Sequence, residues 1–154
     1  LNVVGADGFV CNAAWQAIGF SVGCAVGVAM GQTRRPLVIC GDGGFQMTAQ
    51  ALSTMARHRL PCVVLVLDNA MYGIEQWLLD PGWHAGTNPT AKPYLSLNRW
   101  DYVALAKAMG VASAAEVLEP MALREALKKA LASSGPTLLS VRIRPHDLPS
   151  ELRT

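Results

Sequence analysis

Charged and aromatic residues are scarce in this sequence. Of its 154 residues, 16% are charged and 6% are aromatic, whereas 51% are apolar. This apolar content excludes an intrinsically disordered chain, and the length predicts a single domain. The formal net charge is only +2, and no large basic cluster is present. We therefore expect no nucleic-acid partner, because such binding depends on many contacts between cationic side chains and phosphates.

Closely spaced cysteines are also missing. The four cysteines stand at positions 11, 24, 40 and 62, and no His lies at metal-ligand spacing from them. This pattern predicts buried free thiols and a reducing compartment. No secretory signal pattern is visible, so we expect a cytoplasmic protein. The sequence lacks an initiator Met, which fits either a piece of a longer polypeptide or a processed protein. We expect the first, with residues 1–154 as one domain.

A long uncharged segment runs from residue 8 to residue 33. It is long enough to span a bilayer, which takes about 20 residues. Its glycines fall at positions 19, 23, 27 and 31, so on a helix they form one ridge without side chains. Such a ridge fits a membrane helix dimer or a helix packed closely on a sheet or a partner subunit. We favour the second interpretation, without a membrane, because the segments that follow are typical of a soluble domain.

Those segments alternate between strand and helix patterns. Expected strands span 37–40, 62–67, 111–114 and 137–143, and expected helices span 45–59, 70–79, 101–109 and 120–133. Met47, Ala51, Leu52 and Met55 are expected on one face of the first of these helices. The prolines and glycines of residues 80–97 predict a loop. The alternation predicts an α/β fold, a parallel sheet with helices on both faces.

Polar residues follow the first two strands of this sheet. Residues 41–44 read Gly-Asp-Gly-Gly, and Asp68-Asn69 follow the next strand. Ligands of parallel sheets bind beyond the carboxyl ends of the strands, where one helix and one strand between the two sites bring Asp42 and Asn69 together. A glycine turn that leads into a helix favours a phosphate. Mg²⁺ prefers oxygen ligands of the Asp42 and Asn69 types, so the pair predicts a magnesium–phosphate site.

The spacing of Gly-Asp-Gly and Asp-Asn resembles the magnesium-diphosphate motif of thiamine-diphosphate enzymes. The helix pattern at 15–31 and the run from Asp68 to Glu75 resemble those of 2-oxo-acid decarboxylases of the pyruvate and indolepyruvate type. The resemblance covers most of residues 9–144. It implies the diphosphate-binding domain, which is the C-terminal third of a longer chain in that family.

The resemblance also implies roles for single residues. Asp42 and Asn69 match the side-chain ligands of Mg²⁺, and Met71 matches a backbone carbonyl ligand. Glu75 matches an acidic residue near the thiazolium of thiamine diphosphate. The backbone groups that approach the cofactor match Gly41, Gly43, Gly44, Gly73 and Ile74. Asp68 stands where the family more usually has Asn, and no ligand role follows for it.

The implied activity is that of a lyase, the non-oxidative release of CO₂ and an aldehyde from a 2-oxo acid. A carboligase similar to acetohydroxyacid synthase is the alternative, although such enzymes usually lack an acid at the position of Glu75. A non-catalytic supporting domain is a further alternative. The resemblance implies a homodimer or homotetramer in which a pyrimidine-binding domain grips the other half of the cofactor, so the chain alone should be inactive.

The histidines are weaker candidates. His84 lies in the expected loop, where it is either solvated or part of a cover over the site. His58 stands beside two arginines at a helix end and is expected to be structural. His146 has no partner that the sequence reveals. Trp77, Trp83 and Trp100 are expected as core or interface anchors.

Overall fold

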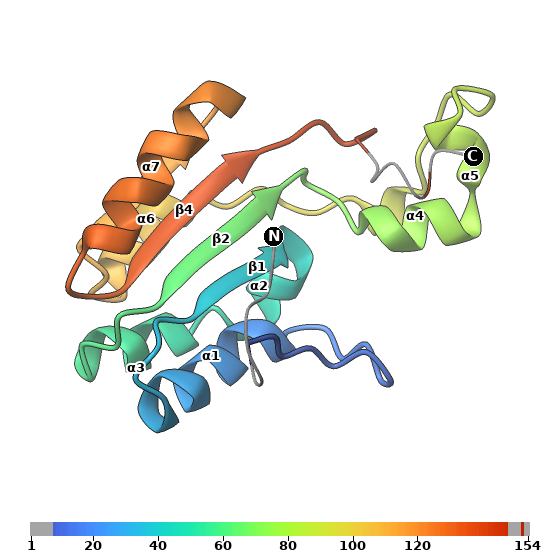
Figure 1. Ribbon diagram of the computed structural model, residues 1–154. Coiled ribbons are helices and arrows are strands. Elements are labelled where there is room, and N and C mark those ends of the chain that lie inside the picture. The colour runs from blue at the N-terminus through green and yellow to red at the C-terminus, as the bar shows by residue number, and fades with distance from the viewer. Residues whose placement is uncertain (1–7, 148–151, 153–154) are drawn as a thin grey trace.

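A parallel sheet of four strands forms the centre of the molecule (Figure 1). The structure is a computed structural model, and it describes residues 8–147 and residue 152. The strands are β1 (Leu37–Gly41), β2 (Val63–Asp68), β3 (Ser113–Val117) and β4 (Thr137–Arg142). Their order is β1-β2-β4-β3, and all neighbouring strands are parallel. The predicted fold class is therefore confirmed.

Seven α-helices and one 3₁₀ helix are present in the described part of the chain. They are α1 (Phe20–Gly31), α2 (Asp42–Thr48), α3 (Ala51–Arg57), α4 (Gly73–Leu79), α5 (Pro81–His84), η1 (Pro93–Leu95), α6 (Tyr102–Ala108) and α7 (Pro120–Ala132). Within the described ranges no helix is long and apolar enough to cross a membrane.

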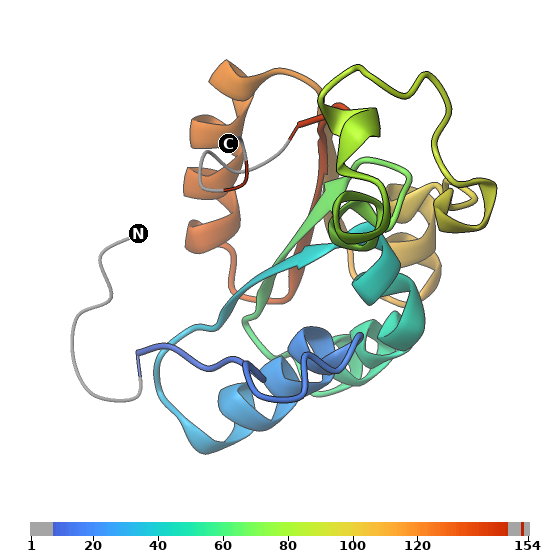
Figure 2. The ribbon, with the colours of Figure 1, turned by 90° about the vertical axis from the view of Figure 1, so that its right-hand side faces the viewer.

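The two faces of the sheet are covered unequally. Val64, Val66 and Leu138 pack on one face with residues of α1, α2, α3 and α6. On the other face Val63 and Leu65 belong to a smaller cluster completed by α7. Figure 2 separates α7 from α6 on opposite sides of the strands. Because the side chains of a strand alternate between faces, these two clusters account for the continuous burial of β2.

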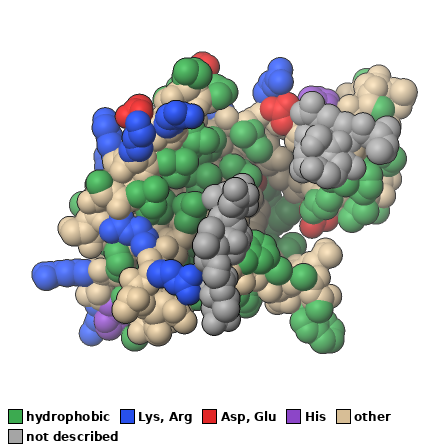
Figure 3. All heavy atoms as spheres, in the orientation of Figure 1, with side chains coloured by type: hydrophobic (Ala, Val, Ile, Leu, Met, Phe, Trp, Pro, Cys, Tyr) green, Lys and Arg blue, Asp and Glu red, His purple; other side chains and the backbone are tan. Residues whose placement is uncertain are grey.

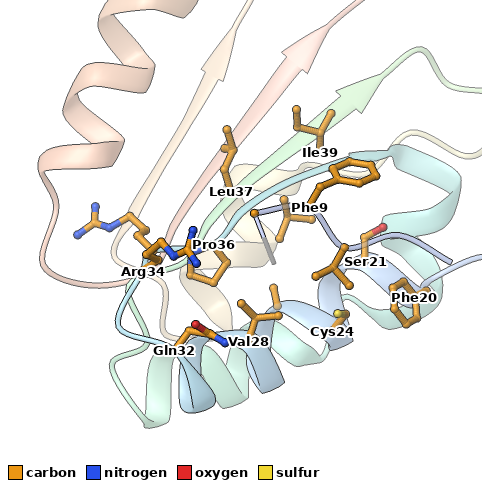
Figure 4. Close-up of a pocket in the computed structure, with 15 residues that line it drawn as sticks. Phe9, Phe20, Ser21, Cys24, Val28, Gln32, Arg34, Pro36, Leu37 and Ile39 are labelled. Atoms are coloured by element: carbon orange, nitrogen blue, oxygen red, sulfur yellow. The ribbon is translucent and has the colours of Figure 1, made fainter. Parts of the chain in front are cut away.

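Strand β1 is an edge of the described sheet, and α7 does not reach it. Leu37 and Ile39 lie on the α7 face, in register with Val63 and Leu65, yet they are 37% and 45% exposed. Figure 3 shows hydrophobic side chains gathered on this side of the molecule. A groove of about 470 Å³ lies between β1, α1 and residues 8–10, and Phe9, Val28 and Leu37 are among its lining residues (Figure 4).

Helix α1 begins at Phe20, five residues later than the family pattern implied. Gly19 adopts a left-handed conformation with φ of 91°, which glycine tolerates, and its carbonyl accepts a hydrogen bond from the Thr48 hydroxyl at 2.8 Å. The ridge on the helix therefore consists of Gly23, Gly27 and Gly31. A Cβ atom built on any of these three would meet nothing within 4 Å.

The helix predicted at 45–59 is wrong in two respects. It begins at Asp42, so residues 42–44 form its first turn rather than a separate loop, and it breaks at residues 49–50 into α2 and α3. Leu52 and Met55 are buried as predicted, but Met47 is exposed. The break explains the difference, because Met47 no longer shares a continuous helix face with the other two.

Other boundaries shifted by smaller amounts. The predicted loop at 80–97 contains α5 and η1, and β3 begins two residues later than expected. The Asp101 carboxylate caps α6 by accepting a hydrogen bond from the Ala104 N–H at 2.8 Å, as an N-cap acid does.

All four cysteines are free, and of these Cys62 is buried whereas Cys11 is exposed. The expectation that the thiols are buried is therefore wrong for Cys11.

Candidate active site

The two polar turns meet at the carboxyl ends of β1 and β2. Asp42 follows β1 directly and is only 1% exposed. One oxygen of its carboxylate accepts a hydrogen bond from the Gly43 N–H at 2.9 Å. The other accepts from the Ala70 N–H at 2.7 Å. Asp42 therefore holds the Asp68-Asn69 turn against the start of α2, and the sequence-based expectation that the two turns converge is confirmed.

The turn after β2 has a defined shape. The Asn69 side-chain oxygen accepts a hydrogen bond from the Met71 N–H at 3.1 Å, which is an Asx turn. Ala70 has φ of 60°, a left-handed conformation that is uncommon outside glycine. Met71 pairs with Ser96 in an isolated antiparallel bridge. Its carbonyl oxygen accepts no hydrogen bond from the residues that the structure describes.

The electrostatics of the turn favour a cation. Burial raises the pKa of Asp42 to about 6, and the charge of Asp68 adds to this shift, whereas the N–H groups of Ala70 and Gly43 oppose it. Within the described residues, no Lys, Arg or His forms an ion pair with Asp42. Its carboxylate is thus a buried negative charge without a cationic partner, which is costly unless the charge is compensated.

The chemistry of the donors fits a magnesium ion. Asp42, Asn69 and Met71 would supply only oxygen atoms, a carboxylate, an amide and a carbonyl, and Mg²⁺ takes such ligands together with water and phosphate. Among the described residues no group of three His, Cys, Asp or Glu side chains could hold a metal by itself. A small set of protein oxygens completed by phosphate therefore suits this site better than an all-protein metal cage.

The glycines near this site have different surroundings. A Cβ atom on Gly43 would lie 2.4 Å from the Tyr72 ring, so a larger residue does not fit there. On Gly73 it would lie 3.0 Å from the Asn69 amide nitrogen. Gly41 has open space, and Gly44 makes only one ordinary contact, with the backbone of Gly19. Packing within the chain therefore explains why Gly43 and Gly73 have no side chain. It does not require glycine at positions 41 and 44, where the backbone has room to approach a ligand.

Helix α4 carries the proposed acid. Glu75 lies in its first turn and is half-buried, and the neighbouring Ile74 is 49% exposed. Glu75 makes no hydrogen bond or ion pair with any residue in the described part of the chain. Figure 1 shows α4 beyond the ends of β1 and β2. Glu75 therefore lies on the helix that follows the Asp68-Asn69 turn, and it has no competing partner among the described residues.

Gln76 is a structural residue that the sequence did not reveal. Its side chain is completely buried, and its oxygen accepts a hydrogen bond from the Lys92 N–H at 2.9 Å. The contact joins α4 to the end of the 80–92 segment and so fixes the helix that carries Glu75. A Gln in a short amphipathic segment gives no sequence signal for such a contact.

Two histidines have contacts that the sequence did not reveal. His146 stacks on the Trp83 ring, with centroids 3.8 Å apart and planes at 22°. His84 contacts the edge of the same ring system, and both its ring nitrogens are buried without a hydrogen-bond partner among the described residues. His84 is thus a packed residue of α5 and not a solvated loop residue. His58 is exposed at the end of α3.

Comparisons with known proteins agree with the geometry. Residues 2–141 match the family model "Thiamine pyrophosphate enzyme, C-terminal TPP binding domain". A probable pyruvate decarboxylase of Schizosaccharomyces pombe is 35% identical over 144 residues, which are 90% of this chain and 23% of that protein. A probable acetolactate synthase large subunit of Methanocaldococcus jannaschii is 30% identical over 147 residues, with 90% and 23% covered.

A solved structure of similar shape is that of benzoylformate decarboxylase from Polynucleobacter necessarius. It superimposes with a TM-score of 0.73 at 29% identity, covering 88% of this chain and 25% of that one. The chain thus spans about a quarter of the length of the relatives that it matches.

Proposed function

The chain belongs to the family of C-terminal TPP-binding domains of thiamine pyrophosphate enzymes, and from this we propose that it serves a 2-oxo-acid decarboxylase. In this proposal residues 1–154 are the diphosphate-binding domain of a longer polypeptide. The observation that carries the proposal is the convergence of Asp42 with the Asn69 turn through the Ala70 N–H. This convergence places oxygen donors suited to Mg²⁺ at the position where the family would bind a magnesium diphosphate.

Three residues would hold the metal. Asp42 would provide a carboxylate oxygen, Asn69 its amide oxygen and Met71 its backbone carbonyl, which is free of other hydrogen bonds within the described residues. Held by these oxygens, the ion would supply positive charge that compensates the buried Asp42 carboxylate and attracts a diphosphate. The backbone of Gly41, Gly43, Gly44, Gly73 and Ile74 would border the cofactor.

Thiamine diphosphate, when bound, supplies an electron sink for the loss of CO₂ from a 2-oxo acid. The chain's own contribution to the later steps would come from Glu75. An unpartnered, half-buried carboxyl group can hold a proton and deliver it to carbon, the role of a general acid. Delivery of that proton favours release of an aldehyde. The names of the pyruvate and benzoylformate decarboxylases above support this direction.

A carboligase is the second candidate. The similarity to an acetolactate synthase large subunit favours it, and the metal and diphosphate residues would serve both reactions equally. Glu75 favours the decarboxylase, since a proton donor ends the reaction before a second carbonyl compound adds.

Another domain or subunit is required to complete the proposed enzyme. Exposed apolar side chains on α1 and the residues before it support such a partner, and Trp15 is 86% exposed. We propose that a pyrimidine-binding domain, in the same or another chain, covers this region in a homodimer or homotetramer. The free cysteines of the described chain suit a cytoplasmic location.

The test is an assay of the complete protein with Mg²⁺ and thiamine diphosphate. Pyruvate, phenylpyruvate and indolepyruvate are supplied in turn, and CO₂ and aldehyde are measured. Release of both in equal amounts supports the decarboxylase. Release of CO₂ with a hydroxyketo acid as product supports the carboligase. Cofactor binding without either product supports a non-catalytic supporting domain.

A further inference from the structure

Asp68 lies at the junction of three segments beside the candidate site. It is the last residue of β2 and is 1% exposed. Arg142, its partner in register on β4, places its Nε 3.2 Å from one carboxylate oxygen. Arg99, from the segment before α6, places its Nε 3.5 Å from the other. One buried carboxylate therefore holds two guanidinium groups from different parts of the chain.

Stability alone does not account for this arrangement. Buried ion pairs contribute little to stability, because desolvation of the charges offsets their attraction. Burial raises the pKa of Asp68, and Arg99 opposes this shift. Arg142 also pairs with Glu116 of β3, whereas Arg99 has no ionic partner other than Asp68 within the described residues. An uncharged Asn at position 68 would avoid the free-energy cost of burying a carboxylate, so stability does not explain the acid.

The neighbouring carboxylate explains what Asp68 contributes. Asp42 and Asp68 directly follow Gly41 and Leu67, which are in register on β1 and β2, so the two carboxylates stand at neighbouring strand ends. Among the described residues Asp42 has two N–H donors but no ion pair with a cationic side chain. Guanidinium groups bind carboxylates strongly and often through two hydrogen bonds. If Asp68 were neutral, the nearest buried carboxylate for the released guanidinium groups would be Asp42.

We propose that Asp68 is a positioning residue that holds Arg99 and Arg142 away from Asp42 and so keeps the Asp42 carboxylate available to the metal ion. This inference rests on the proposed function, since it concerns the same metal site. It gives a role to a residue of the motif that departs from the usual family pattern, and it makes the acid at position 68 and the arginine at position 99 a functional pair.

The experiment measures Mn²⁺ affinity in the complete protein by electron paramagnetic resonance with thiamine diphosphate present. Asp68→Asn should weaken Mn²⁺ binding by roughly 10- to 100-fold, the usual effect of losing a residue that supports a metal ligand. Adding Arg99→Gln to Asp68→Asn should restore most of the affinity, because one competing guanidinium is gone. Glu125→Gln is the matched control, since it removes the same charge from an exposed ion pair on α7.

The double variant separates positioning from simpler effects. Arg99→Gln is also measured alone. If Asp68 acted only through its charge or through the fold, Arg99→Gln would change Mn²⁺ affinity by the same factor in the wild type as in Asp68→Asn, and the two effects would add. Additive effects, or wild-type affinity in Asp68→Asn, would overturn the inference. The midpoint of thermal unfolding is recorded for every variant, and a positioning role predicts that it does not follow the Mn²⁺ affinity.

Two further outcomes are decisive. If Asp68→Asn does not fold, the triple variant that also carries Arg99→Gln and Arg142→Gln removes all three charges, and it should bind Mn²⁺ nearly as well as the wild type. A tenfold or greater loss in that variant contradicts the inference. If the wild-type protein binds no Mn²⁺ with the cofactor, the proposed function itself fails and the inference fails with it.

Discussion

Asp42 and Ala70 are joined by a hydrogen bond of 2.7 Å from the Ala70 N–H to the Asp42 carboxylate. The bond ties the end of β1 to the turn after β2, although 27 residues separate the two in sequence. Ala70 adopts a left-handed conformation there, and the bond holds the turn that carries Asn69 against the Asp42 carboxylate. The bond is therefore the physical basis of the proposed metal site.

Removal of the Asp42 carboxylate should abolish Mg²⁺-dependent binding of thiamine diphosphate. Asp42→Ala leaves the phosphates without a bridging cation and also breaks the bond to Ala70. Asn69→Ala should weaken binding less, because one neutral ligand is lost. Calorimetry on the complete protein checks both, with Glu125→Ala on α7 as a control of equal charge. Unchanged cofactor affinity in Asp42→Ala would refute the site.

The stability of the metal-free protein should depend on Asp42. Its pKa of about 6 lies above the ordinary value of about 3.9, so the folded state holds a proton that the unfolded chain has lost between about pH 4 and 6. Stability should therefore fall as the pH rises through this window. Thermal unfolding across this range tests the expectation, and Asp42→Asn should reduce the dependence, with the part due to the raised pKa of Asp68 remaining.

Metal binding should show the opposite trend with pH. Mg²⁺ requires the ionised carboxylate, so below pH 6 its affinity should fall by about tenfold per pH unit as protons compete for Asp42. Titration with Mg²⁺ at several pH values, in the presence of thiamine diphosphate, measures the slope. An affinity that does not change between pH 5 and 7 would show that Asp42 does not exchange a proton for the metal.

Glu75→Gln should lower turnover by roughly 10²–10⁴, the usual contribution of a general acid. Cofactor affinity should stay near that of the wild type, since Glu75 forms no hydrogen bond or ion pair with the metal residues. Steady-state kinetics and cofactor titration provide the two measurements. Normal CO₂ release with accumulation of a carboligation product would place Glu75 at the late protonation step. Wild-type turnover would return Glu75 to the role of a surface residue.

Arg35 should stabilise the end of α7. Its guanidinium donates to the carbonyls of Ala130, Leu131 and Ser133, at 2.9 Å and 2.6 Å for the first two, and so satisfies acceptors that a helix end leaves free. Arg35→Ala should lower the free energy of unfolding by about 1–3 kcal/mol. Urea denaturation measures the change, and Lys129→Ala, an exposed cation in the same last turn, should have a much smaller effect.

Gly23→Leu should weaken assembly without disturbing the domain. Nothing lies within 4 Å of a Cβ built on Gly23, so the folded chain has room for a larger side chain, whereas a close partner would not. Light scattering of the complete protein should show a smaller assembly, with Gly135→Leu, outside α1, as the control.

The 154-residue chain assayed alone should release no CO₂, because the proposed site needs a second domain to grip the other half of the cofactor. Steady CO₂ release from a proven monomer would contradict this division of the site between two domains.

The sequence by itself determined the α/β architecture and the meeting of the two turns. Short apolar runs such as 37–40 and 62–67 are typical of strands in a parallel sheet, although only the second is buried on both faces here, and parallel strands bring their carboxyl ends to one edge of the sheet. These constraints are local or topological, so composition and order suffice to predict them. Local signals also predicted α7 correctly, because Pro120 marks its start and a glycine and a proline follow its end.

Only the tertiary structure decided the contacts between distant side chains. The pairing of Asp68 with Arg99 and Arg142, the Arg35 cap on α7 and the stacking of Trp83 on His146 join residues 31 to 98 positions apart. Hydrophobic periodicity carries no information about such pairs, since each depends on where packing places two polar or aromatic groups. The helix break at 49–50 belongs with them, because propensity along the chain favours one continuous helix and packing against α1 and the sheet selects two.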